Sequence, residues 1–196
     1  MNLKLADAAI AAYEPKLSES EAARLRFFRT LWGVQDELQY EYPSAVTYEV
    51  PQAADLKACS EAEQPTMRAY PVSFDSEALV DGVARMAAAM ALFDEFDQSS
   101  RDALAGVRWD RMVAASDVKL AGTDPAAYVD AFVGLLVDDG LSEDAARMGA
   151  AAVSLALRAF LEPMAQAAQQ ARSDNGVDKP YPVHCPVCGC EASVAH

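Results

Sequence analysis

The stretch between Ala145 and Glu162 restricts the fold of this chain more than any other part of its sequence. Most of its residues are Ala, Val, Leu, Met or Phe, and its polar side chains share one narrow stripe of a helix: Arg147, Ser154, Arg158 and Glu162. A helix that is apolar around most of its circumference must be covered by other elements. The stretch therefore predicts a long central helix that opens at Ser142 and that Pro163 kinks or ends. Residues 171–183 are expected to form a linker.

Recognisable helix starts recur through the rest of the chain. Ser18–Glu21 has the pattern of a capping box, and Asp124 with Pro125 forms a pair of N-cap and first helical residue. Asp75 can cap a further helix, and a shorter helix is expected over 3–13. Alanine, the strongest helix former, dominates a composition that is 52% hydrophobic. The sequence therefore predicts an all-α fold of about six helices in a single domain.

Residues 43–74 interrupt this helical pattern. Four prolines divide the segment, and no helical period survives between them: Pro43, Pro51, Pro65 and Pro71. We expect a long irregular connection here, with short extended pieces over 46–50 and 67–74, and loops of this length are usually functional or mobile. Cys59 falls in this segment with no histidine nearby, so we interpret it as incidental rather than as a nucleophile.

The charge balance and the types of residue present narrow the set of functions. The formal net charge is -14, and a surface this acidic repels nucleic acid and anionic membranes, supports solubility and favours basic partners. Both histidines lie near the C-terminus, so no catalytic triad can form in the helical part of the chain. The sequence also has no glycine-rich phosphate loop and no nucleophile elbow. We therefore expect a protein that is not an enzyme.

Cysteine spacing and the N-terminal sequence indicate the compartment. Three of the four cysteines lie within six residues, too close together to staple a domain as in secreted proteins. The N-terminal residues lack the long apolar run of a signal peptide. Charged residues interrupt the apolar stretch near the C-terminus, so we expect no insertion into a membrane. The sequence thus predicts a cytoplasmic protein.

The motif HCPVCGC near the end of the chain carries its most specific chemistry. Cys185 and Cys188 are two residues apart, so their thiolates can chelate one metal ion, and Gly189 permits the tight turn that follows. The pattern is typical of zinc ribbons and rubredoxin-like knuckles; a thioredoxin-type redox pair would instead open a helix after a strand. Cys185, Cys188 and Cys190 are therefore candidate metal ligands, with iron or zinc as the metal.

The completion of this site is left open. A tetrahedral site needs about four ligands, and His184 and His196 are the other nearby donors. The alternatives are a metal-free tail, a metal held between two chains of a homodimer, or ligands supplied by a longer form of the chain. We expect residues 1–172 to form an all-helical binding domain, and residues 173–196 a linker with a partial knuckle.

The order of these features resembles one known family. A helix with the residues RL…WGVQ (24–35) precedes the proline-marked stretch, and the helix AAVSLALRAFLEPMAQ (151–166) is followed by a short linker and CPVCG. This resembles the formate dehydrogenase accessory protein family (FdhE), which joins a helical domain to rubredoxin-like modules with several CxxC pairs. The resemblance implies a cytoplasmic maturation factor that binds the formate dehydrogenase catalytic subunit and holds iron through its CxxC motifs.

The chain also departs from the family pattern. Cys190 stands where the family usually has a small residue, and the later CxxC pairs are missing, so the resemblance carries metal binding only to Cys185 and Cys188. Either the sequence is a fragment, or it is a short relative that kept the helical domain. Two other functions stay open: an all-helical chaperone that recognises the twin-arginine signal peptide of molybdoenzymes, and a metal-binding regulator.

Overall fold

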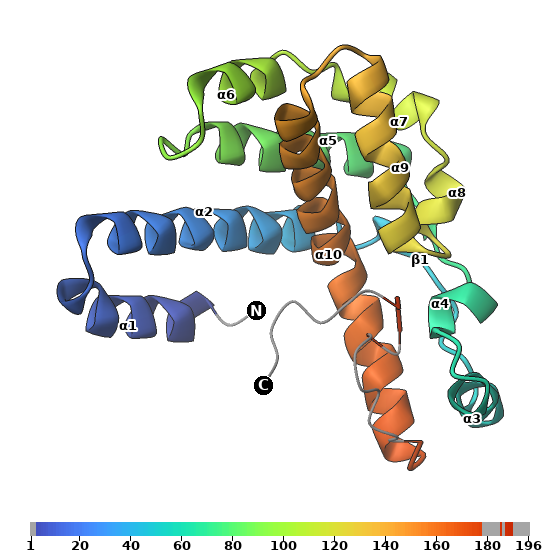
Figure 1. Cartoon of the computed structure of the whole chain (residues 1–196). Coiled ribbons are helices and arrows are strands. Elements are labelled where there is room, and N and C mark those ends of the chain that lie inside the picture. The colour runs from blue at the N-terminus through green and yellow to red at the C-terminus, as the bar shows by residue number, and fades with distance from the viewer. Residues whose placement is uncertain (1–2, 178–184, 186, 190–196) are drawn as a thin grey trace.

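The computed structural model describes residues 3–177, 185 and 187–189, which form a predominantly helical protein (Figure 1). Within these residues there are ten α-helices: α1 (Leu3–Tyr13), α2 (Glu19–Glu41), α3 (Ala53–Glu61), α4 (Thr66–Ala69), α5 (Ser76–Ala91), α6 (Gln98–Ala105), α7 (Trp109–Ala115), α8 (Val118–Ala121), α9 (Pro125–Asp138) and α10 (Glu143–Asp174). Strands β1 (Val46–Thr47) and β2 (Ser73–Phe74) form a small antiparallel sheet. The all-α prediction is confirmed, but the expected number of about six helices was too low.

Residues 43–74 account for part of this difference, because they are not an irregular connection. They contain α3 and α4, and the two ends of the segment pair as β1 and β2. Asp55 accepts a hydrogen bond from the backbone N–H of Gln52 (3.2 Å) and so caps α3. The four prolines lie outside the helices of this segment, where they separate elements rather than prevent them.

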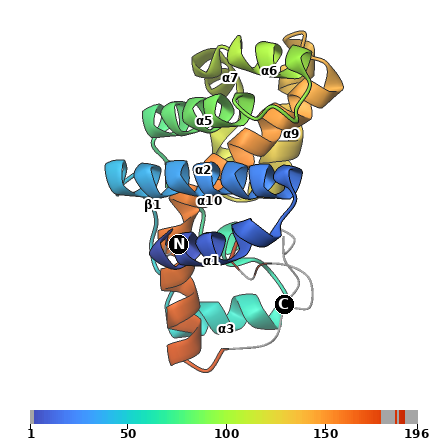
Figure 2. The ribbon, with the colours of Figure 1, turned by 90° about the vertical axis from the view of Figure 1, so that its left-hand side faces the viewer.

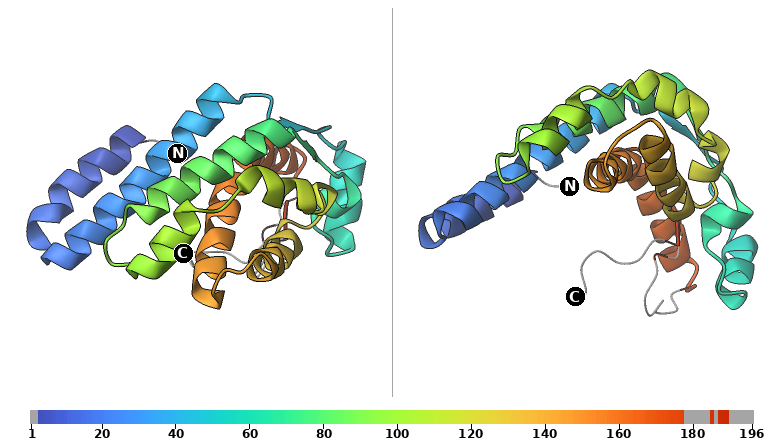
Figure 3. Two further views of the ribbon diagram at one scale, coloured as in Figure 1. Left: turned by 90° about the horizontal axis from the view of Figure 1, so that it is seen from above. Right: turned by 45° about the horizontal axis from the view of Figure 1, so that its top comes forward.

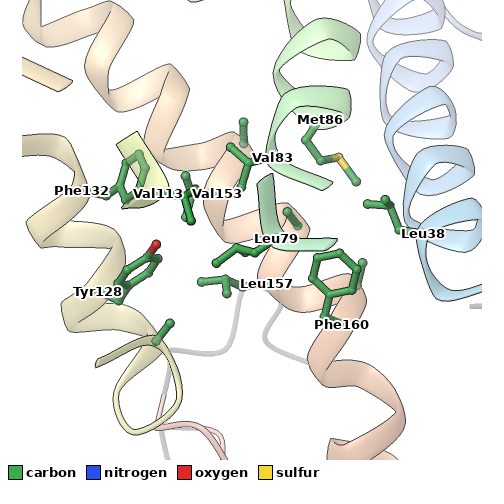
Figure 4. Close-up of a cluster of buried hydrophobic side chains, with 14 of the residues drawn as sticks. Leu38, Leu79, Val83, Met86, Val113, Tyr128, Phe132, Val153, Leu157 and Phe160 are labelled. Carbon is green, nitrogen blue, oxygen red and sulfur yellow. The ribbon is translucent and has the colours of Figure 1, made fainter. Parts of the chain in front are cut away.

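Helix α10 is the central element that the sequence predicts. It contacts α2, α5, α6 and α9, and it crosses α2 and α5 steeply in Figure 1. Figure 4 shows side chains of α10 meeting those of the neighbouring helices, with Leu157 and Val153 between Val83 on one side and Tyr128 and Phe132 on the other. These side chains are almost completely buried. The first part of α10 therefore forms the axis around which the core is built.

Pro163 neither ends α10 nor leaves its backbone unsatisfied. In an uninterrupted helix the carbonyl of Ala159 would accept a hydrogen bond from residue 163, but proline has no N–H. Gln39 of α2 supplies the donor instead: its Nε2 donates to the Ala159 carbonyl (3.1 Å) and to Glu162 Oε2 (2.8 Å). The helix then continues to Asp174, past the expected domain boundary at residue 172.

The second part of α10, after Pro163, has different neighbours. Figure 2 shows it extending away from α2 and α5 with α3 beside it, and α3 contacts α10. Met164, Ala168 and Arg172 are its buried residues and recur at every fourth position. This part of the helix therefore buries one narrow stripe, against the segment that runs from β1 to β2.

At the other end of the molecule, α1 and α2 form a helical arm. Figure 3 shows α1, α2, α5 and α6 lying roughly parallel to one another, with α1 at the outside of the layer. Helix α1 has no buried residue and packs mainly on α2, where Asp7 forms an ion pair with Arg29. Helix α1 therefore extends the layer without adding to the core, whereas α2 contributes Leu31 and Leu38 to it.

Helix α10 also bears on the question of a membrane. Among the described residues it is the one helix long and apolar enough to cross a bilayer, contrary to the expectation from its charged residues. Of its most apolar window, 56% is buried inside the protein. The core helix of a soluble protein has the same character, so this property is weak evidence for membrane insertion.

Candidate functional site

The cysteine knuckle is a tight turn, as its sequence predicts. The backbone N–H of Gly189 donates to the carbonyl of Cys185 (2.8 Å), which closes the loop around Cys188. Gly189 has a φ of 75°, in the left-handed region where glycine is favoured. The thiols of Cys185 and Cys188 are both partly buried and pack against the hydrophobic core cluster. The turn thus holds the two cysteines on one side, facing the helical body.

The knuckle is seated on the start of α4, between α4 and α10 (Figure 1). The N–H of Met67 donates to the carbonyl of Val187 (2.9 Å), and the side chain of Val187 is only 3% exposed. A Cβ atom at Gly189 would lie 2.8 Å from Cγ of Pro65, so only glycine fits this close approach. The described residues of the knuckle are therefore part of the packed structure and not a tail detached from it.

The two thiols of the knuckle are coupled. The pKa of Cys185 is raised far above its ordinary range, first because its thiol is hydrogen-bonded to Cys188, and further because of burial and the charge that Cys188 would carry. A metal ion that binds here must displace the proton of Cys185. The affinity of such a site therefore depends on pH.

Two thiols are the right donors for iron or zinc, but they are not a complete ligand set. Among the described residues, no group of three or more His, Cys, Asp or Glu side chains could hold a metal ion. Cys190, His184 and His196 lie outside the described residues. The described part of the chain thus brings together Cys185 and Cys188 and supplies about half of a tetrahedral site.

Cys59 lies on α3 and not in an irregular loop. It is buried, and burial raises its pKa, an effect to which Asp55 adds and which Arg172 opposes. A buried thiol with a raised pKa is a poor nucleophile. The geometry is consistent with the interpretation that Cys59 is not a nucleophile.

A second feature lies beside the knuckle and was not predicted from the sequence. Two small hollows flank Tyr48, and we call them together the Tyr48 groove. The lining of the first includes Tyr48, Val50, Met67, Tyr70, Met164 and Ala168. The lining of the second includes Gln39, Tyr42, Val46, Tyr48, Phe160 and Pro163. Met67 lines the groove and also holds the knuckle, so the two features share α4.

The rim of the Tyr48 groove is acidic. Glu49 lines the groove directly, and the hydroxyl of Tyr42 is hydrogen-bonded to Asp81 (3.1 Å). A hydrogen bond to Asp55 raises the pKa of Tyr70, and burial adds to this effect. Arg85 is the cation beside Asp81, and it is shared with Glu37 (2.5 Å) and Glu41 (2.7 Å). The local charge is therefore negative.

The sequence could not reveal this groove because its walls come from distant parts of the chain. Residues between Gln39 and Val72 form one wall, and residues between Ala159 and Ala168 of α10 form the other. One sequence feature could have indicated it: tyrosines lie among the prolines of residues 43–74, and aromatic residues are unusual in a mobile connection.

Comparisons of this chain with protein-family models, with curated proteins and with solved structures give no match.

Proposed function

We propose that this protein is a non-enzymatic accessory factor whose helical body binds another protein. Two features of the described residues support this class. The Tyr48 groove offers aromatic and aliphatic side chains within an acidic rim, which suits contact with a protein segment. The knuckle is seated on the same short helix, so a bound partner and the thiol pair would be close together.

Within this class, the proposed role is that of a cytoplasmic maturation factor for formate dehydrogenase, which binds the catalytic subunit during assembly. The observation that carries this proposal is the seat of the knuckle: Val187 is buried and bonded to Met67, and Gly189 abuts Pro65. A CPVCG turn that is packed against an all-helical domain agrees with the resemblance to the FdhE family. The resemblance, and not the geometry, supplies the name of the client.

Metal binding at Cys185 and Cys188 is a subsidiary part of the proposal. The pair would hold iron or zinc together with Cys190 or with the thiols of a second chain. Bound metal would replace the thiol protons of both cysteines and fix the turn on α4. The role of the metal would then be to stabilise this part of the surface.

Co-expression with a formate dehydrogenase catalytic subunit tests the proposed function. We expect the tagged protein to retain the subunit through affinity purification, and Tyr48→Ala to reduce the amount retained. Tyr40→Ala is the matched control, because Tyr40 is 87% exposed and does not line the groove. If the unaltered protein retains no catalytic subunit, the assignment to formate dehydrogenase is wrong.

The acidic rim also favours a second candidate, a chaperone for the twin-arginine signal peptides of molybdoenzymes. Two adjacent arginines would find Glu49 at the groove and Asp81 beside it. Retention of the catalytic subunit with and without its signal peptide separates the two functions. A maturation factor retains both forms, whereas a signal-peptide chaperone retains only the form that carries the signal.

A further inference from the structure

Among the described residues, the small sheet ends beside the Tyr48 groove in an edge that has no backbone partner. Strand β1 pairs with β2 through only two residues on each side, Val46 with Phe74 and Thr47 with Ser73. Beyond this point, the backbone groups of Tyr48, Glu49 and Val50 form no hydrogen bond with another described residue. A segment with unpaired backbone donors and acceptors is a template for the addition of another strand.

The register of the sheet explains why the pairing stops here. It makes Tyr48 and Val72 a non-hydrogen-bonded pair, and the N–H of Val72 points away from β1 and donates to the carbonyl of Gly122 (3.0 Å). The next pair that would exchange hydrogen bonds is Glu49 with Pro71, and proline has no N–H to donate. Strand β2 therefore does not continue along Tyr48–Val50.

Two apolar hollows lie next to this edge. Tyr48 lines both, and Val50 lines one of them while remaining 45% exposed. Successive side chains of an added strand point to opposite faces. Every second residue of such a strand could therefore be directed toward the hollows, while the residues between them meet the rim.

Three carboxylates stand at or next to this groove. Glu49 lines it, Asp55 is hydrogen-bonded to Tyr70, and Asp81 is hydrogen-bonded to Tyr42 and also pairs with Arg85. A ligand with basic residues would complement this rim, whereas an acidic ligand would be repelled by it and by a chain with a net charge of -14.

We propose that the Tyr48 groove binds an extended segment of a partner protein, in which aliphatic residues alternate with arginine or lysine. The segment adds as a strand along Tyr48–Val50, packs aliphatic side chains over the two hollows and directs its basic side chains to the carboxylates. This inference deepens the proposed function, and rests on it, by naming the kind of segment through which a client is held.

A synthetic peptide tests the proposal without any client protein. The probe is a labelled peptide in which valine and leucine alternate with arginine, and fluorescence anisotropy measures its affinity for the full chain. A matched peptide carries glutamate at every arginine position, and a third carries N-methylated backbone nitrogens, which cannot donate hydrogen bonds. We expect the arginine peptide to bind at least about tenfold more tightly than either control.

Two variants of the protein localise the binding. Tyr48→Ala and Glu49→Lys should each weaken binding of the arginine peptide by about tenfold or more. The control variants are Tyr40→Ala on α2 and Asp138→Lys at the end of α9, which remove a tyrosine and reverse an acidic charge away from the groove. They should leave the affinity for the arginine peptide unchanged. The amide protons of Tyr48 and Val50, which point to the same edge of the strand, should exchange more slowly when the peptide is bound, whereas that of Glu49, which points to the other edge, should not.

Equal binding of the arginine and glutamate peptides would overturn the proposal. Equal effects of Glu49→Lys and Asp138→Lys would also overturn it, even if Tyr48→Ala does not fold. Failure of the proposed function has a different signature: the arginine peptide binds at the groove, but the formate dehydrogenase catalytic subunit is not retained. If the protein retains that subunit but does not bind the peptide, the proposal that the groove binds an extended segment is wrong, while the proposed function remains supported.

Discussion

The two parts of α10 have the same helical backbone but opposite relations to the rest of the molecule. Before Pro163 the helix is buried on nearly every side by α2, α5, α6 and α9, and the buried residues there are mostly alanine, valine, leucine and phenylalanine. After Pro163 it buries only a stripe at every fourth position, against residues 43–74. The first part is organised for stability, while the second part carries the groove and the knuckle.

This difference shows how one long helix can serve two purposes. Burial on all sides of the first part fixes its position in a core that needs nothing from the knuckle. The second part leaves space beside Met164 and Ala168, and that space forms one of the hollows next to Tyr48. Changes in the two parts should therefore have unequal effects on stability.

Introduction of a charge into each part should show the largest difference. Leu157→Asp places a carboxylate among fully buried side chains and should abolish the cooperative unfolding transition, a loss of at least about 4 kcal/mol. Met164→Asp should cost about half as much, because its side chain can reach the adjoining hollow. Urea unfolding followed by circular dichroism measures both.

Arg158→Asp is the control for this comparison, because Arg158 is exposed on the same helix and next to Leu157. It should remain folded. If Leu157→Asp unfolds no more easily than Met164→Asp, the first part of α10 is not the centre of the core.

The junction between the two parts should respond to loss of the Gln39 side-chain amide. Gln39→Leu leaves the carbonyl of Ala159 without a donor and should cost about 1–3 kcal/mol. Gln35→Leu is a matched change on α2 that removes a similar bond to the carbonyl of Leu155 (2.9 Å). That carbonyl still has its helical donor from residue 159, so we expect a cost below about 1 kcal/mol.

A double-mutant cycle isolates the cause. Pro163→Ala restores the missing N–H within the helix, so Gln39→Leu should cost much less in that background. An unchanged cost in the presence of Ala at position 163 would show that Gln39 contributes by packing and not by its hydrogen bond.

The sequence predicted the first part of α10 better than the second for a physical reason. A run of apolar residues indicates a helix that is buried on nearly every side, and cap residues such as Ser142 and Asp124 indicate where helices begin. Both features are local, so both could be predicted from the sequence. The continuation past Pro163 depends on Gln39, a residue more than a hundred positions away, and no local pattern reveals that contact. Residues 43–74 were misread because their helices are short and are stabilised by contact with α4 and α10.

The candidate site divides in the same way. The turn at Cys185–Gly189 follows from spacing and from the glycine, and both are local features. Its position on Pro65 and Met67 follows from tertiary packing, and no local pattern indicates it. The Tyr48 groove requires both walls, so it could be found only in the folded structure.

An ion pair between α4 and the start of α9 should make the stability of the protein sensitive to acid. Arg68 of α4 donates to Asp124 at the start of α9 (2.5 Å), and this bond is the first cause of the lowered pKa of Asp124. A carboxyl with a lowered pKa adds stability above its unfolded pKa, and this stability is lost as the pH falls through the folded pKa, below about 4.

Asp124→Asn keeps the helix cap but removes this charge, so it should reduce stability by about 0.2–1 kcal/mol at neutral pH and by less in acid. Urea unfolding at neutral and acidic pH measures the difference. Asp130→Asn changes an exposed residue of the same helix, and its effect on the free energy of unfolding should not become smaller in acid. A difference from the unaltered protein that stays constant with pH would contradict the role of the ion pair.

The smallest effect is expected at the knuckle itself. Cys185→Ser with Cys188→Ser should change the metal-free free energy of unfolding by less than about 0.5 kcal/mol, since both thiols are only partly buried and lie at the edge of the core cluster. Added iron or zinc in reducing buffer should stabilise the unaltered protein and not the double variant, because a ligand that binds only the folded state raises its stability.

Cys59→Ser is the matched control, because it removes a buried thiol of α3 and leaves the knuckle unaltered. It should lower stability without removing the response to metal. A large loss of stability in the metal-free double variant would mean that the thiols are packing residues of the core. A response to metal that survives in the double variant would place the metal site elsewhere, and the seat of Val187 and Gly189 on α4 would then have to be explained by packing alone.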